Sequence, residues 1–103
     1  MTGILNFSPV LAEVFSERMR QVERFGHTTQ ADFDAYWNDS NGRTRLASVA
    51  VRFSDGARDH LSVGSLKAAR DYALRAAATN VALVELIDRV IENSTAPADG
   101  GKA

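Results

Sequence analysis

A long helical pattern covers the last third of the chain and constrains the fold more than any other feature. The pattern begins after Ser65, a good N-cap residue, and can continue to about Glu92, which is about 40 Å at 1.5 Å per residue. An apolar stripe and a second apolar flank leave the end of this helix apolar around more than half of its circumference. Such a helix is either central to the fold or shared with a second subunit, so we expect a homodimer formed through it. The stripe consists of Leu66, Ala69, Ala73, Ala77, Val81, Val84, Ile87 and Ile91.

The length of the chain leaves room for one domain. A chain of 103 residues can enclose one hydrophobic core but not two. We therefore expect an arm over residues 1–7, a globular domain over 8–93 and a disordered tail over 94–103, which is rich in small, polar and helix-breaking residues. The chain contains no cysteine, which excludes disulfides, thiolate metal sites and a cysteine nucleophile.

Charge and hydropathy bear on the class of partner and on location. The 12 basic and 13 acidic residues give a net charge of −1, which argues against nucleic-acid binding driven mainly by phosphate neutralisation. The amino-terminal residues lack the charged start and cleavage site of a secretory signal, and no run approaches ~20 apolar residues. We expect a cytoplasmic protein that does not enter membranes and whose partner is not nucleic acid.

The first helix is predicted from Ser8 to Phe25. Ser8 is a good N-cap residue, Pro9 suits the first helical turn, and Gly26 stands where a helix-ending glycine belongs. Apolar residues recur between them at helical spacing and predict a stripe that faces the core. The stripe consists of Leu11, Val14, Phe15, Val22 and Phe25.

A short second helix and a loop are predicted over residues 28–43. Thr28 or Thr29 can cap the helix, and the run from Asn38 to Arg43 is typical of a loop. The aromatic residues of the helix, at positions i, i+3 and i+4, more often belong to a core than to a surface that stacks on a base. They are Phe33, Tyr36 and Trp37.

The segment from Arg45 to Val63 has two interpretations. With a period of two, alternate residues share a face, and the run from Ser54 to Ala57 makes the turn of a β-hairpin. With a period of 3.6, the segment is an amphipathic helix. The turn residues and the second alternating run favour the hairpin, so we expect a mainly α fold of the α+β class, with an all-α fold as the alternative. The face shared in the helical alternative contains Leu46, Val49, Ala50 and Phe53.

Two polar residues interrupt apolar stripes and are therefore candidates for a special role. Arg18 lies in the middle of the first stripe, where its guanidinium either pairs with a carboxylate or binds an anion in a cleft. Asn80 lies in the stripe of the long helix, either as a buried amide that sets helix register or as a ligand contact. The carboxylates considered as partners of Arg18 are Asp32, Asp34, Asp71 and Asp88.

The first helix also carries a short signature. Residues 17–21 read Glu-Arg-Met-Arg-Gln, and residues 26–28 read Gly-His-Thr. This pattern resembles small phage and prophage proteins that begin with an E-R-x-R-Q helix, continue with a glycine and an acidic segment, and end in an alanine-rich helix. Some of these proteins resemble the all-α, MazG-like nucleotide pyrophosphohydrolases. The resemblance covers residues 14–34 and, more loosely, residues 74–89.

The acidic residues depart from what that resemblance implies for catalysis. MazG-like enzymes are similar to one another in placing an E-E-x-x-E group and a second acidic pair around Mg²⁺, a hard cation that needs clustered carboxylates. Glu85 and Asp88 could supply half of such a site, and Glu13 and Glu17 are the best substitute for the other half. Because no complete set is present, we expect no catalytic residues and no cofactor.

These observations lead to a primary hypothesis and two alternatives. The primary hypothesis is a non-enzymatic phage- or prophage-derived accessory protein that binds a host protein and inhibits a defence system. The first alternative is an Mg²⁺-dependent nucleotide pyrophosphohydrolase that uses Glu13, Glu17, Glu85 and Asp88. The second is a nucleotide-binding protein without turnover that uses Arg18 and Trp37. Under the primary hypothesis the partner-binding residues are Glu17, Arg20, Arg24 and Asp55.

Overall fold

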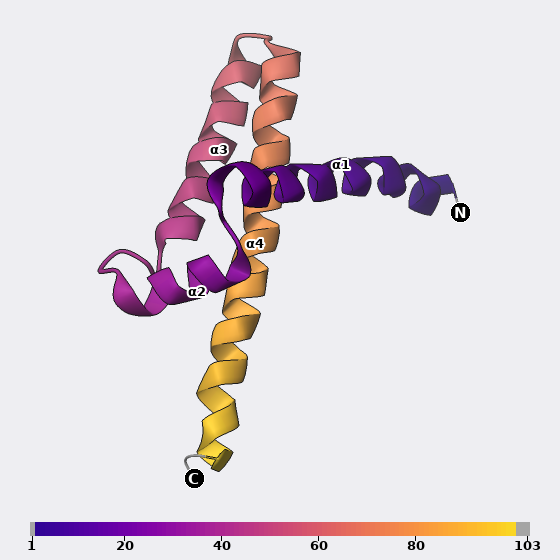
Figure 1. Ribbon diagram of the computed structural model, residues 1–103. Helices are drawn as coiled ribbons and strands as arrows, with labels where there is room; N and C mark the ends of the chain where they lie inside the picture. Colours follow the sequence, from indigo (N-terminus) through magenta and orange to yellow (C-terminus); the bar gives the residue numbers. More distant parts are fainter. Residues whose placement is uncertain (1, 101–103) are drawn as a thin grey trace.

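The computed structural model contains α1 (Thr2–Phe25), α2 (Thr29–Asn38), α3 (Arg45–Ser62) and α4 (Leu66–Gly100), and no strand among residues 2–100 (Figure 1). The structure describes the backbone of these residues and the side chains of residues 9–94. α3 and α4 form an antiparallel pair, α1 crosses α4, and α2 lies farther along α4 toward its C-terminus (Figure 1). α4 contacts each of the other three helices, and α3 most extensively. The long helix is therefore central to the fold, as its apolar pattern predicted.

The β-hairpin expected over residues 45–63 is wrong, and the all-α alternative is correct. Arg45–Ser62 is the single helix α3, and the run read as a hairpin turn lies in its interior. Gly56 is in that run because the helix pair leaves no space for a side chain. A Cβ atom at this position would lie 2.7 Å from Cδ1 of Tyr72 on α4. A glycine that permits close helix packing was thus misinterpreted as a turn residue.

The turn between α3 and α4 is made eight residues later, at Gly64. This glycine has a φ of 78°, a left-handed conformation that other residues adopt only with strain. The backbone N–H of Ser65 donates to the carbonyl oxygen of His60 at 2.9 Å, the bond that closes a Schellman motif. Gly26, with a φ of 69°, ends α1 as predicted. Glycine therefore ends both α1 and α3, and the chain changes direction after each of them.

Two helices are longer than predicted. α1 begins at Thr2 rather than at Ser8, so Pro9 lies inside the helix. α4 continues to Gly100, past the end expected near Glu92. Residues 101–103 of the predicted tail lie outside the described residues. The division of the chain into an arm, a domain and a disordered tail stays a prediction.

The interior of the fold is filled mainly by alanine. Most of the large apolar side chains lie on the surface instead, including Leu11 at 62% and Phe15 at 69% exposed. The radius of gyration is 16.5 Å, whereas a globular chain of this length has about 13 Å. One chain therefore leaves much of its apolar surface in contact with water. The buried hydrophobic residues are Ala50, Ala69, Ala76, Ala78, Ala82 and Leu86.

No helix within residues 2–100 combines the length and the apolar character needed to cross a bilayer.

Candidate functional site

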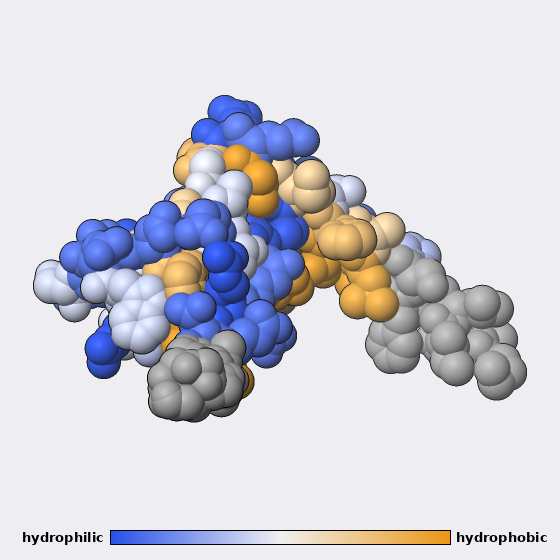
Figure 2. All heavy atoms as spheres, turned by 60° about the horizontal axis from the view of Figure 1, so that its bottom comes forward, coloured by the Kyte–Doolittle hydropathy of each residue, from blue (hydrophilic) through white to orange (hydrophobic). Residues whose placement is uncertain are grey.

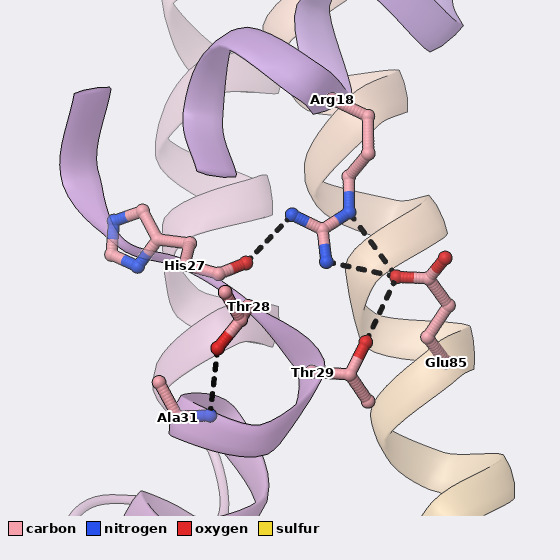
Figure 3. A network of polar contacts seen from close by, with 6 residues as sticks. All are labelled: Arg18, His27, Thr28, Thr29, Ala31 and Glu85. Carbon is pink, nitrogen blue, oxygen red and sulfur yellow. Dashed lines mark hydrogen bonds and ion pairs between the residues drawn. The ribbon is translucent and has the colours of Figure 1, made fainter. Parts of the chain in front are cut away.

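Arg18 is the centre of a polar junction between α1, α2 and α4 (Figure 3). Its side chain is almost fully buried, and its Nε and Nη2 atoms donate to one oxygen of Glu85 at 3.2 and 2.9 Å. Its Nη1 atom donates to the carbonyl oxygen of His27 at 2.7 Å. The hydroxyl of Thr29 lies 3.4 Å from the same Glu85 oxygen. The interpretation of Arg18 as one half of an ion pair is thus correct, but its partner is none of the four aspartates considered.

A second polar pair lies beside this junction. Gln21 and Thr79 are both buried, and the amide Nε2 of Gln21 donates to the Thr79 hydroxyl at 3.3 Å. That hydroxyl in turn donates to the carbonyl oxygen of Arg75, one turn earlier on α4, at 2.8 Å. Gln21 is one turn of α1 away from Arg18, so both residues project toward α4. Two polar contacts of buried residues therefore join α1 to α4.

The signature of residues 17–28 consequently has a structural explanation in this protein. Arg18 and Gln21 bind α4, and Glu17 forms an i,i+3 ion pair with Arg20 at 2.6 Å. Gly26 ends α1, and the hydroxyl of Thr28 accepts from the backbone N–H of Ala31 at 3.0 Å as the N-cap of α2. The contacts of Arg18 and Gln21 position the α1–α2 corner on α4, and Gly26 and Thr28 shape the corner itself. The motif here builds the corner of the fold.

Three of the four carboxylates of the alternative metal site form ion pairs with arginines. Glu13 pairs with Arg70 at 2.7 Å, and the hydrogen bonds from that guanidinium lower the pKa of the Glu13 carboxyl. Glu17 pairs with Arg20, and Glu85 pairs with Arg18. Among the residues that the structure describes, no group of three acidic or histidine side chains is arranged to hold a metal ion. Asp88 lies one turn after Glu85 on α4 and does not complete such a metal-binding group.

A cavity of about 480 Å³ lies beside the junction, between the end of α1, α2, α3 and α4. Its walls are mainly apolar, with Arg20, His27, Asp32 and Arg45 among the polar residues that line it. Oδ2 of Asp32 is buried and has no hydrogen-bond partner in the described structure. Burial raises the pKa of this carboxyl, while the charges of His27, Arg18 and Arg45 oppose the shift. The volume of the cavity is typical of a small-molecule site. Its polar residues are spread over several helices and loops.

Arg18 and Trp37, the two residues of the nucleotide-binding alternative, serve different parts of the fold. Neither lines the 480 Å³ cavity. The Trp37 ring is half-exposed and makes edge contacts with Tyr36 at 5.0 Å and Phe33 at 6.2 Å between ring centroids. The Arg18 guanidinium is already bonded to Glu85 and to the His27 carbonyl. The structure does not bring these two side chains together.

The predicted partner-binding residues lie on two helices. Glu17, Arg20 and Arg24 are spaced three and four residues apart, and so they share one face of α1. Asp55 was expected at an exposed turn, but it lies inside α3, where it forms a surface ion pair with Arg58 at 3.5 Å. The charged face of α1 is therefore a coherent surface, and Asp55 is a separate position.

Exposed apolar residues form the surface that sequence reasoning missed. α1 projects beyond α4 as an arm (Figure 1), and apolar residues gather on the part of this arm whose side chains the structure describes (Figure 2). The sequence did show the apolar stripe, but we assigned it to the core. Arg18 lies within this stripe and Gln21 next to it, and they were the available sign that polar residues take part in the contact with α4. The apolar arm face, as we define it, consists of Leu11, Phe15 and Met19, each at least half-exposed.

Comparison of the chain with protein-family models, with curated proteins and with solved structures found no match.

Proposed function

We propose that the protein is a non-enzymatic binding protein that uses the apolar arm face of α1 to recognise another protein. The observation that supports this function is the distribution of apolar residues. Alanines fill the interior, while leucine, phenylalanine and methionine line a projecting helix. Moving such side chains out of water on binding is favourable by roughly 1.5–3 kcal/mol for each one that becomes fully buried. An exposed apolar face on a small chain is typical of an interaction site.

The shape of the arm specifies the chemistry of the partner. Leu11, Phe15 and Met19 are spaced four residues apart, so they form one row along the helix. An amphipathic helix with such a row fits an apolar groove on another protein. The charged face with Glu17, Arg20 and Arg24 lies on the other side of α1 and stays in water when the row enters a groove. We therefore expect the partner to offer an apolar groove that is wide enough for one helix.

The identity of the partner follows from the sequence resemblance alone. The E-R-x-R-Q signature resembles phage and prophage proteins, which supports a host protein as the partner and inhibition of a defence system as the outcome. The two alternatives have less support from the geometry. The enzyme requires carboxylates that pair with arginines here, and the nucleotide-binding protein requires Arg18 and Trp37 to lie together.

The test compares two double variants with the unmodified chain in affinity capture from host lysate. Leu11→Ser with Phe15→Ser removes the centre of the apolar arm face. Leu61→Ser with Val63→Ser is the matched control, because these residues are equally exposed but lie at the α3–α4 turn. We expect the unmodified chain and the control to retain the same host protein and the arm variant to lose it. Equal capture by all three chains, or capture by none, would contradict the proposed function.

A thermal-shift panel tests the two alternatives. Nucleoside triphosphates are added with and without Mg²⁺, and the melting temperature of the protein is measured. Binding to the folded state raises the melting temperature in proportion to the logarithm of the free ligand concentration. The proposed function predicts no change. A rise that requires Mg²⁺ supports the pyrophosphohydrolase, and a rise without Mg²⁺ supports the nucleotide-binding protein.

A further inference from the structure

The exposed side of α4 carries a heptad pattern. The relevant residues follow one another at intervals of four, three, four, three and four, which is the spacing of the a and d positions of a coiled coil. All of them are exposed or half-buried, Val84 at 56% for example. We call this row the α4 seam. It consists of Ala73, Ala77, Asn80, Val84, Ile87 and Ile91.

We propose that the α4 seam pairs with the α4 seam of a second copy, with the two helices antiparallel. The distribution of side-chain size supports this direction. The first half of the seam carries alanines, and the second half carries valine and isoleucine. In an antiparallel pair, Ala77 of one copy lies opposite Ile87 of the other, and Ala73 opposite Ile91. The four outer layers then each combine a small side chain with a large one, and the two central layers combine Asn80 with Val84, which are similar in size.

The distribution of charge supports the same direction. From Leu66 to Ala78 the helix carries three basic residues and one acidic residue, Asp71. From Thr79 to Ser94 it carries one basic residue, Arg89, and three acidic ones. Antiparallel helices place the positive half of each copy beside the negative half of the other, whereas parallel helices place like charges together. Arg70 and Glu85 already pair with Glu13 and Arg18 of the same chain, and the two halves keep their opposite signs without them. The helix dipoles are also opposed in the antiparallel pair.

Asn80 occupies one of the two central layers of this pair. The expectation of a buried amide is not met in the single chain, because Asn80 is exposed. In the proposed pair it lies opposite Val84 and next to the layer that contains Asn80 of the second copy. A polar residue in the middle of a seam fixes register at some cost in stability. Asn80 therefore gives this pairing a defined register.

The chain contains no cysteine, which allows a direct test of direction. Ala77→Cys and Ile87→Cys are prepared as separate single variants and treated with a short thiol cross-linker, alone and as a mixture. The antiparallel pair predicts that only the mixture yields a species of twice 11.2 kDa. Leu61→Cys, at a more exposed position on α3, is the control and should not cross-link. Sedimentation of the unmodified chain should show a dimer.

Each other outcome would overturn the inference. Cross-linking of either seam variant by itself indicates parallel helices, and equal cross-linking of the control indicates random collision. Absence of cross-links together with a monomeric unmodified chain excludes the dimer. The inference extends the proposed function to a second surface, and the two fail separately, because the cysteine variants do not change α1. A cross-linked dimer without capture of a host protein would support pairing through the α4 seam and contradict only the proposed function.

Discussion

α4 holds its two largest neighbours by different means. Against α3 it uses rings and small residues: Tyr72 packs on Gly56, stacks on His60 at 5.3 Å and lies 6.3 Å from the ring of Phe53. Against α1 it uses Glu85 and the polar pair of Gln21 and Thr79. Ring packing depends on shape, while the polar interface depends on charge and hydrogen-bond partners. The two interfaces should therefore respond to different substitutions.

Glu85→Gln should have the largest effect, because it removes the only carboxylate that the described structure places against the buried Arg18 guanidinium. Loss of one partner of a fully buried ion pair costs about 3–5 kcal/mol. We expect about 2–3 kcal/mol here, since the Glu85 side chain is 44% exposed and water remains nearby. Urea unfolding measures the change. Glu13→Gln, which breaks the exposed pair with Arg70, is the control and should change stability little. Equal losses would show that burial of Arg18 is irrelevant.

Gly56→Ala should weaken the α3–α4 interface. Alanine favours a helix over glycine by about 1 kcal/mol, so a helix in isolation would gain stability. Here the new methyl group would lie 2.7 Å from the Tyr72 ring, which is held between His60 and the Arg75 guanidinium. We expect a net loss of about 1–2 kcal/mol, because overpacking outweighs the gain in propensity. A stabilised variant in thermal unfolding would mean that the helices separate easily at this point.

Thr79→Val tests the smaller polar contact between α1 and α4. The substitution keeps the shape of the side chain but removes the hydroxyl that accepts from Gln21. A buried donor without a partner costs about 1–3 kcal/mol, and we expect the lower end because the bond is 3.3 Å long. Adding Gln21→Leu should restore most of the lost stability, since both polar groups are then gone. A double variant with the summed losses of the single ones would contradict a direct interaction.

The same two interfaces show what the sequence could predict. Local signals identified Gly26, a threonine cap at 28 or 29 and the helices α1, α2 and α4, because each depends on neighbouring residues. The expectation that the aromatic residues of α2 belong to a core is not met, because α2 contains no buried residue. The pairing of Arg18 with Glu85 joins residues 67 positions apart, and no local pattern specifies it. Gly56 was misread for a related reason: its role depends on Tyr72, which lies on another helix.

Periodicity also shows which residues share a face but not what covers that face. The apolar stripe of α1 was correctly grouped, yet Phe15 is on the surface while Arg18 and Gln21 are buried. Their burial depends on where α4 crosses α1, which is a property of the tertiary structure. The role of the charged face of α1 in partner binding consequently stays a prediction, and the apolar arm face on the other side of the helix was assigned to a core.

Asp32→Asn should have the smallest effect, and its sign depends on pH. Burial is the main cause of the raised pKa of Asp32, with Glu85 adding to it and His27, Arg18 and Arg45 opposing it. A carboxyl whose pKa is higher in the folded state binds a proton more readily there than in the unfolded chain. Stability is therefore lost as the pH rises from the unfolded value of 3.8 through the folded one.

The amide variant has no such loss of stability. We therefore expect its melting temperature to be slightly higher than that of the unmodified protein at pH 7, and equal to it near pH 3. Melting curves between these pH values measure the difference. Asp34→Asn, an exposed position on the same helix, is the control and should show little change. A variant that melts lower at pH 7 would show that the ionised Asp32 is stabilised by a partner. That partner would lie in the cavity beside Arg20 and Arg45, and the polar junction would then extend into it.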